Sequence, residues 1–453
     1  MRGLHTASAW ARTIERATLL ALAMFALAAT HAAAVPAFAI QTGQPCNACH
    51  VGGFGPRLTP FGRSFKIGGY TARTDSFNVP LSAMAVASYV RTLKAQPGPP
   101  APGFSANDNF AIDQISLFVA GGVGGHLGGF IQTTYDGVAK AFHWDNLDLR
   151  AVTTVKVKGK DLVLGATLNN APTVQDGWNS LAAWGYPFTT SNLAPHPAAS
   201  PLLAGALAQN TLGLTAYAWL NNEFYSEVGG YRSPSADFLI HAGVDPTAPG
   251  DISGTAPYGR IAYQKNFGDH NFEVGAFGMA ANIFPGRDHS AGASDHFTDL
   301  GLDASFQIFR ANKDVIMVNA RYTHENQRLD ASLPLGLAQN PSDSLSDIRV
   351  DAAYYWRDKI GLTIAVFDTW GSPDALLYPD ARTFRPDSDG VLLQLDGTPW
   401  GAGGSPLGRR FNMRLGIQYV AYGRFNGAGA NFDGAGRNAS DNNTLRVFSW
   451  IAY

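Results

Sequence analysis

Two cysteines and a histidine form a short chemical motif near the start of the chain, Cys46-Asn47-Ala48-Cys49-His50. Cys-x-x-Cys followed directly by histidine is the attachment signature of a c-type haem, in which the thiols bond to the haem and the histidine becomes the proximal iron ligand. These are the only two cysteines in 453 residues. A structural disulfide or a redox dithiol would also use Cys-x-x-Cys, but neither accounts for His50. The motif therefore predicts one covalently attached haem c, held by Cys46, Cys49 and His50.

The sequence after the motif offers few candidates for the second axial ligand of the haem iron. Residues 51 to 83 contain no histidine and no methionine, so Met84 is the nearest candidate for the distal position. A thioether ligand raises the reduction potential, as the oxidation of a high-potential donor would require. Met84 can equally be an apolar residue at the start of the first strand. A later histidine or methionine, or an open sixth position, is also compatible with the motif.

The first 34 residues have the pattern of a secretory signal peptide. A basic stretch that begins at Arg2 precedes an apolar run over 17–29, and an alanine-rich stretch ends at Ala34. A retained membrane anchor is the alternative, but the apolar run is shorter than the roughly 20 residues that a spanning helix needs. We expect cleavage after Ala34, or after Ala39, and haem attachment outside the cytoplasm.

The composition excludes several classes of protein. Charged residues make up only 15% of the chain, the formal net charge is −2, and no stretch after residue 34 is apolar for 18 or more positions. We therefore expect no further membrane helices. No basic patch dominates the sequence, which argues against nucleic acid as a partner. No hydrolytic or transferase arrangement of serine, histidine and aspartate stands out either.

Most of the remaining chain alternates apolar and polar residues over segments of about ten positions, which is the period of a β-strand. Clear examples are the segments 146–157, 347–356 and 410–419. In the last of these segments, one face is apolar and carries Phe411, Met413, Leu415, Ile417 and Tyr419. The other face is polar and carries Arg410, Asn412, Arg414 and Gln418. We expect the apolar face to contact lipid and the polar face to line a wet interior.

About 16 such segments follow one another, and an even number is what an antiparallel bacterial barrel requires. They begin near residues 82, 108, 124, 142, 160, 209, 221, 255, 270, 293, 313, 345, 359, 387, 408 and 441. The connections alternate between tight turns and long loops rich in Pro, Ser, Asp and Gly, the longest from about 171 to 208. Short periplasmic turns and long external loops are typical of outer-membrane barrels.

A soluble β-sandwich is the main alternative fold, because its strands also turn one face to water. Segment lengths near ten, the difference between turns and loops, and the terminal aromatic Tyr453 together favour a membrane barrel. A β-helix would need a short fixed repeat, and we find none. The predicted fold is therefore all-β, a transmembrane antiparallel barrel of about 16 strands over 81–453, located in the cell outer membrane.

Residues 39–70 and 436–445 carry a resemblance to a known family. The first stretch contains Gln-Thr-Gly, Cys-x-x-Cys-His and Leu-Thr-Pro-Phe-Gly-Arg in that order, and the second reads Gly-Arg-Asn-Ala-Ser-Asp-Asn-Asn-Thr-Leu. They resemble the fused monohaem cytochrome-porins of iron-oxidising bacteria, in which a short N-terminal haem segment precedes an outer-membrane barrel. The resemblance implies a monohaem cytochrome c segment over 35–80 and, as in the family members studied as iron oxidases, electrons taken from Fe(II) at the cell surface.

Geometry suggests where the haem segment lies. The apolar band of such a barrel is about 25 Å tall, and one haem outside the barrel cannot bridge it. A 16-stranded barrel has room for a channel or a plug, so we expect 35–80 inside the lumen, entered from the periplasmic end. Four cations of the segment are candidate partners for haem propionates and inward carboxylates, or they only solvate the lumen: Arg57, Arg63, Lys66 and Arg73. The inward carboxylates are Asp148, Asp299, Asp303, Asp347 and Asp351.

The sequence thus predicts an outer-membrane electron conduit. An extracellular donor, Fe(II) or another reductant, would pass one electron to the haem, and a soluble periplasmic cytochrome would accept it. The other predicted partner is outer-membrane lipid. Loop acids could hold Fe(II) briefly, or could simply be solvated; they are Asp288-His289, Asp295-His296, Asp374, Asp380, Asp387 and Asp389. The alternative function is a diffusion porin whose haem segment is a redox-responsive plug.

Overall fold

The computed structural model describes residues 37–74, 81–185, 187, 189–408 and 411–453. The chain divides into two units, Met1–Ala34 and Val35–Tyr453, and the second unit is the one described below. The expected signal peptide over 1–34 lies outside the described residues. Within them, no helix is long and apolar enough to cross a membrane.

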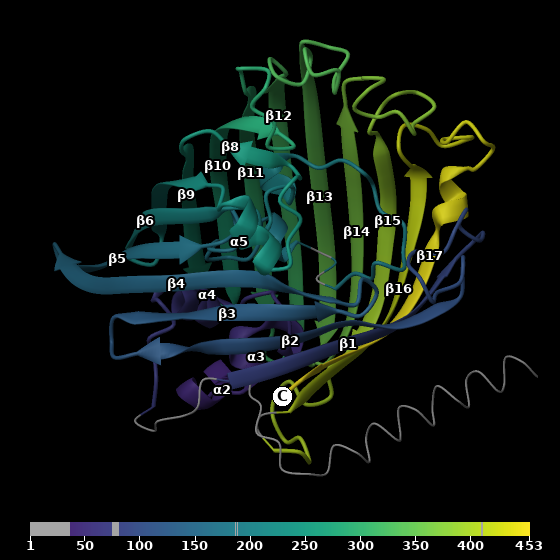
Figure 1. Ribbon diagram of the computed structural model, residues 1–453. Coiled ribbons are helices and arrows are strands. Elements are labelled where there is room, and N and C mark those ends of the chain that lie inside the picture. Colours follow the sequence, from purple (N-terminus) through teal and green to yellow (C-terminus); the bar gives the residue numbers. More distant parts are fainter. Residues whose placement is uncertain (1–36, 75–80, 186, 188, 409–410) are drawn as a thin grey trace, which may run out of the picture. The chain divides into compact units, whose positions relative to one another are not determined.

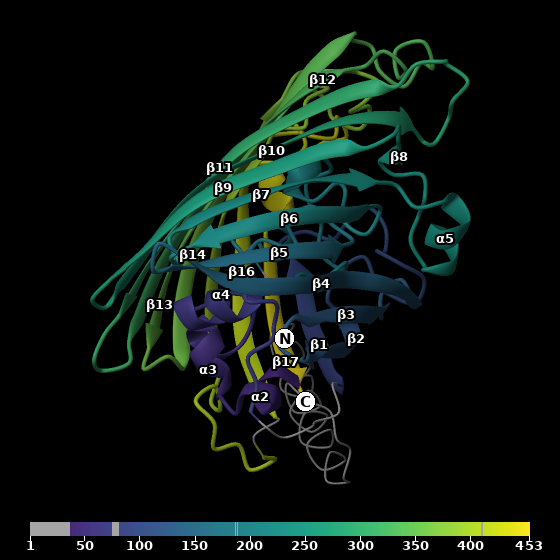
Figure 2. The ribbon, with the colours of Figure 1, turned by 90° about the vertical axis from the view of Figure 1, so that its left-hand side faces the viewer.

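Sixteen long antiparallel strands form a closed barrel (Figures 1 and 2). They are β1 (Leu81–Thr92), β2 (Asn109–Val123), β3 (Leu127–Asp136), β4 (Ala141–Val157), β5 (Lys160–Asn169), β6 (Leu212–Leu220), β7 (Phe224–Arg232), β9 (Ala256–Phe267), β10 (His270–Pro285), β11 (Asp295–Phe309), β12 (Val315–Arg328), β13 (Ser342–Trp356), β14 (Ile360–Gly371), β15 (Ser388–Gly397), β16 (Asn412–Arg424) and β17 (Thr444–Ala452). A three-residue strand, β8 (Gly250–Ile252), pairs with the end of β10.

Each long strand pairs with the next one along the chain, and the ring closes between the two ends of the sequence. β1 pairs with β2 on one side and with β17 on the other, with Met84 opposite Ala452 in the closing pair. Only β8 interrupts the sequence order, because β7 pairs directly with β9. The predicted all-β barrel of 16 strands is confirmed. The largest offset is at β16, which was expected from 408 and begins at Asn412.

The two faces of the barrel wall differ as the alternation predicts. On β16, Leu415 and Ile417 are 48% and 49% exposed on the outside, whereas Arg414 and Gln418 are buried on the inside. Closure pairs the backbone of every long strand on both sides, which a strand needs in order to span a hydrocarbon layer. The wall with its apolar outer face is that of an outer-membrane barrel, and the predicted location in the outer membrane is confirmed.

Most of the short connections lie at one end of the barrel. The turns after β4, β6, β9, β11 and β13 lie at this end, as does Tyr453 at the close of the chain. The connection 398–411, between β15 and β16, also lies at this end but is much longer than the others. Because tight turns are periplasmic in barrels of this kind, we assign this end to the periplasm. The opposite end carries the long loops, including short helix α5 (Ala236–His241).

Residues 37–74, called the N-terminal plug from here on, fold into three short helices inside the ring of strands (Figures 1 and 2). The helices are α2 (Ala37–Thr42), α3 (Cys46–Cys49) and α4 (Pro60–Ile67). Plug atoms bond to strands all around the ring, and their partners include Gly122 of β2, Asp148 of β4, Tyr217 of β6, Gln307 of β11, Asp351 of β13 and Asn412 of β16. The expected place of this segment, in the lumen at the tight-turn end, is therefore observed for residues 37–74.

The longest external connection, 170–211 between β5 and β6, also turns into the barrel. Trp178, Leu181 and Leu203 of this inward loop are among the largest fully buried side chains of the described residues. The inward loop meets the N-terminal plug directly: Lys66 Nζ donates to the carbonyl of Val174 at 2.7 Å and to the Asn179 side chain at 2.6 Å. Plug and inward loop are thus in contact within the lumen.

Candidate functional site

The Cys-x-x-Cys-His motif is a single helical turn. Helix α3 runs over Cys46–Cys49, and the His50 amide donates to the Cys46 carbonyl at 2.9 Å. Residues three positions apart lie on the same side of a helix, so the turn brings the two cysteines together. The cysteines are not joined in a disulfide. The spacing seen in the sequence therefore has the geometry that attachment of one group through two thiols requires.

The turn is held by the segment that follows it. Thr59 donates its amide to the Cys49 carbonyl at 2.9 Å and its hydroxyl to the Ala48 carbonyl at 2.5 Å. The Thr59 hydroxyl also accepts the amide of Gly62, and so caps α4. A Cβ atom at Gly62 would lie 2.2 Å from the Cys49 carbonyl oxygen, so only glycine allows α4 to approach this closely. The sequence Leu-Thr-Pro-Phe-Gly-Arg thus fixes the motif from behind.

Burial keeps the three motif side chains neutral near pH 7. It lowers the pKa of His50 to about 4, an effect that the nearby Gly55 backbone only partly offsets. The Nδ1 atom of His50 is enclosed, although the residue as a whole is partly exposed. Burial raises the pKa of Cys46, and burial together with the neighbouring thiol raises that of Cys49 to about 11. A neutral imidazole is the form that binds a metal.

A cavity of about 790 Å³ opens next to Cys46 at the periplasmic end. The plug side is formed by Ile40 and Cys46, and the opposite side by Trp400 and Leu407 of the connection 398–411. The Asn47 amide donates to a carbonyl of this same connection. Sequence reasoning did not find this cover. The signal available was a tryptophan followed by glycines shortly before the strand segment expected from 408.

These residues fit a c-type haem. The thiols are unbridged and one helical turn apart, and the adjacent imidazole is neutral. The cavity is within the range of about 300–1,000 Å³ of cofactor and ligand sites, and Cys46 is the motif residue that lines it. Cys46 and Cys49 would hold the group covalently, and His50 would be its proximal ligand. A haem bound there supplies one-electron transfer chemistry.

Met84, the candidate distal ligand, lies on β1 with its side chain toward the lumen. The Trp450 indole N–H donates to its sulfur at 3.3 Å, and the Trp450 ring packs against Phe54 with 4.5 Å between centroids. Trp450 therefore connects Met84 to the N-terminal plug at Phe54, which is four residues after His50 in the chain. These contacts fit the alternative of an apolar residue at the start of the first strand, and the role of Met84 as a ligand stays a prediction.

The four cations of the N-terminal plug have different partners. Arg57 pairs with Asp351 at 2.5 Å, whereas Arg63 donates to neutral side chains, among them Ser305 at 2.9 Å. Lys66 binds the inward loop, as described above, and Arg73 donates to a backbone carbonyl of β2. The expected pairing of plug cations with inward carboxylates is thus observed directly at Arg57.

The remaining inward carboxylates mostly bond to the wall or the inward loop. Asp303 pairs with Arg260 at 2.7 Å, and Asp299 accepts the amide of Leu203. Asp347 accepts from Arg321. Asp148 pairs with Arg150 and also accepts the hydroxyl of Tyr70 from the N-terminal plug at 2.7 Å. Asp148 and Asp351 are therefore the two predicted carboxylates for which the described residues show bonds to the plug.

Two of the external acids considered for transient iron contact, Asp374 and Asp295, have structural roles. Asp374 accepts the amides of Leu376 and Gln339. Burial alone would raise the pKa of Asp374, but these backbone bonds outweigh it and hold the pKa below the usual value. Asp295 accepts the amides of Ala331 and Ser332. Within the described ranges, no three His, Cys, Asp or Glu side chains come together as a group that could hold a metal ion.

No family model and no curated protein matches the chain. Among solved structures, it is similar to Pseudomonas putida OprB (12% identity, TM-score 0.48, 82% of this chain and 94% of that one). It is also similar to an anion-selective porin from Comamonas acidovorans (12%, 0.45, 82% and 98%) and to Salmonella typhi OmpF in complex with daunomycin (13%, 0.45, 84% and 100%). At these values the likeness carries no argument about function, and the strand pairing of the chain itself establishes the barrel.

Proposed function

We propose that this protein is an outer-membrane electron conduit of the cytochrome-porin type, with one c-type haem on Cys46, Cys49 and His50. Its donor is extracellular, Fe(II) in our proposal, and its acceptor is a soluble periplasmic cytochrome. The observation that carries the proposal is that the Cys-x-x-Cys-His turn lies on a segment packed into the lumen of a closed barrel. A redox group inside the wall is what electron transfer across an otherwise insulating membrane needs.

The contacts inside the lumen favour a fixed N-terminal plug. Lys66 bonds to the inward loop, and Asn179 of that loop donates to the Pro56 carbonyl at 2.8 Å. Arg63 is fully buried among wall residues. An element with this many buried polar bonds has a high cost of release, because each broken bond leaves an unsatisfied buried group. Such a plug suits a conduit that carries electrons and holds back solutes.

The position of the motif divides the path into two parts. The cavity at Cys46 lies at the end assigned to the periplasm, where a soluble cytochrome has access. A donor outside the cell must therefore act from the lumen side, across the N-terminal plug and the inward loop. The lumen between inward loop and wall is consequently part of the proposed path.

A second candidate function is a diffusion porin whose haem segment is a redox-responsive plug. The observation that favours it is a pocket of about 590 Å³ inside the barrel, between the inward loop and the wall. Solutes could use this space if the N-terminal plug were displaced. The two functions differ in whether the plug stays in place when the haem changes its redox state.

The first test is covalent haem retention by the full chain, expressed with a c-type haem attachment system and stained on a denaturing gel. We expect a haem band for the wild type and none for Cys46→Ala/Cys49→Ala, with both proteins present in the outer membrane. Addition of Fe(II) to intact cells should then reduce the haem absorption of the wild type. A stained double variant, or haem that Fe(II) outside the cells leaves oxidised, would contradict the proposal.

A further inference from the structure

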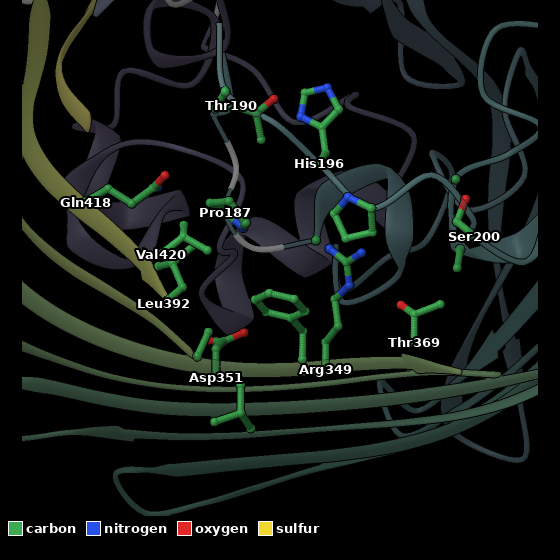
Figure 3. A pocket seen from close by; sticks show the side chains of 18 of the residues that line it. Pro187, Thr190, His196, Ser200, Arg349, Asp351, Thr369, Leu392, Gln418 and Val420 are labelled. Atoms are coloured by element: carbon green, nitrogen blue, oxygen red, sulfur yellow. The ribbon is translucent and has the colours of Figure 1, made fainter. Parts of the chain in front are cut away.

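A pocket inside the barrel, called the lumenal pocket below, lies between the inward loop and the inner faces of β12 to β17 (Figure 3). The wall contributes three guanidinium groups, those of Arg321, Arg349 and Arg446, and the loop contributes Thr190 and His196. Its volume of about 590 Å³ is in the range of small-molecule sites. The haem motif uses none of these residues.

The charges at the wall do not balance. Arg321 Nη2 donates to Asp347 at 3.1 Å, and Arg349 Nε lies 3.5 Å from the same carboxylate. Two guanidinium groups therefore share one carboxylate, which also accepts the hydroxyl of Thr369 at 3.0 Å. The Arg349 side chain is 40% exposed, and Figure 3 shows it pointing from the wall toward the part of the loop that carries His196. One positive charge thus faces the open space.

The other charged groups of the lumenal pocket are already paired. Arg446 donates to Asp113 at 2.8 Å and to the Thr189 carbonyl at 2.6 Å. Asp351 is the one carboxylate among the described lining residues, and it pairs with Arg57. A bare cation would find no free carboxylate in this lining. An anion would meet the positive field of Arg349, whose planar fork matches the oxygens of a carboxylate or phosphate group.

We propose that the lumenal pocket binds a small oxyanion, a molecule with carboxylate or phosphate groups, at Arg349. Gln418 and Ser200 line the same space and can donate to its remaining oxygens. The site is separate from the haem motif, and nothing in its chemistry depends on a bound haem. Its ligand is defined by the unbalanced guanidinium charge and by the size of the space.

The floor of the lumenal pocket gives the site a role in electron transfer, and this step rests on the proposed function. Asp351 holds Arg57, whose carbonyl accepts the amide of Val51 at 2.9 Å, next to His50 in the chain. Fe(II) bound by a carboxylate ligand such as citrate would be held on the loop side of the N-terminal plug. That Fe(II) would give up one electron and become Fe(III), and a haem held by Cys46, Cys49 and His50 would supply the one-electron acceptor chemistry.

The test is calorimetric titration of the purified full chain in detergent with citrate and, separately, with inorganic phosphate. We expect binding of at least one of them, weakened about tenfold to a hundredfold in Arg349→Gln, since a bond to a charged group is lost. Arg349→Lys, which keeps the charge without the fork, should fall between the two. Arg328→Gln is the matched control, because Arg328 is an exposed arginine on β12 that pairs with Asp330 outside the lumenal pocket.

Folding is checked by the heat-dependent gel mobility of each barrel, so that a loss of binding is counted only for folded protein. Absence of binding for both anions, or equal binding by wild type and Arg349→Gln, would overturn the site. A second arm compares haem reduction by Fe(II)-citrate in wild type and Arg349→Gln. If wild type binds the anion and Arg349→Gln does not, but both reduce the haem at equal rates, the donor role alone is overturned. If Fe(II)-citrate reduces the haem in neither protein, the result counts against the proposed function.

Discussion

Arg57 of the N-terminal plug and Asp351 of β13 form an ion pair with 2.5 Å between Nη2 and Oδ2. The pair joins two parts of the molecule with different roles. On the plug side, the Arg57 backbone bonds to Val51 beside the haem motif, and on the wall side Asp351 lines the lumenal pocket. Because Arg57 is buried and Asp351 nearly so, the pair fixes the plug to the wall at the point where the two meet.

Removal of one partner should therefore loosen the N-terminal plug. Arg57→Met leaves Asp351 with the amide of Asn319 at 3.2 Å as its remaining described side-chain bond, and breaking a buried pair typically costs about 3–5 kcal/mol. We expect faster protease cleavage within the plug of the folded barrel. Arg57→Met/Asp351→Leu should recover much of the loss, since no charge stays unpaired. Cleavage of Arg57→Met at the rate of the wild type and of an Arg328→Met control would refute this role.

Close packing at Gly62 should decide whether haem can be attached. In Gly62→Ala the new methyl group would meet the Cys49 carbonyl at 2.2 Å, so α4 or the motif must shift, at about 1–3 kcal/mol. We expect less covalent haem per folded barrel, measured by haem absorption against protein. Gly98→Ala is the control, because no atom lies within 4 Å of a Cβ at that position. Equal haem content in the two variants would show that this contact does not shape the motif.

Charge on the two faces of one strand should have unequal effects on membrane assembly. Leu415→Arg places a cation on the lipid side of β16, at about 2–4 kcal/mol near the midplane. Val420→Arg places it on the lumen side of the same strand, where Val420 lines the lumenal pocket and the new side chain has open space. We expect slower or incomplete folding into bilayers for Leu415→Arg only, followed by gel mobility. Similar folding yields for the two variants would mean that the faces are assigned incorrectly.

The bond between Lys66 and the inward loop should depend on pH. Burial lowers the pKa of Lys66 from 10.5 to about 7 while the N-terminal plug is seated in the lumen. Between pH 7 and pH 10.5, Lys66 is therefore mostly neutral in the seated plug and protonated in a plug that has left the lumen. Stability of the seated state then rises with pH across this window. Hydrogen exchange of the plug amides is measured in wild type and in Lys66→Met at about pH 7 and about pH 9. The ratio of the wild-type exchange rate to the Lys66→Met rate should be lower at about pH 9 than at about pH 7. A pH-independent difference between the two proteins would contradict the depressed pKa.

Local alternation predicted the barrel wall because each strand residue faces either lipid or the lumen. Apolar residues face lipid and polar residues face the lumen, so the residue type indicates the side. Leu415 and Arg414 show this at neighbouring positions. The motif could also be predicted from the sequence, since Cys46, Cys49 and His50 need only one helical turn to come together. In both cases the information is contained within a few consecutive residues.

The interior was less predictable, because its contacts join residues that are far apart in the chain. The inward loop was expected outside, although buried apolar residues such as Trp178 and Leu203 are unusual in an external loop and were a usable signal. The partners of Arg63 are amides and a hydroxyl brought together only by closure of the ring. The same holds for the cover of the cavity at Cys46 by Trp400.

Electron transfer across a sealed liposome tests the central claim most directly. The full chain is reconstituted with a soluble cytochrome trapped inside as acceptor, Fe(II) is added outside, and ion conductance is recorded in planar bilayers from the same preparation. The conduit predicts reduction of the trapped acceptor by the wild type, none by Cys46→Ala/Cys49→Ala, and low conductance for the wild type. An intact protein that conducts ions like an open porin and leaves the acceptor oxidised would contradict it.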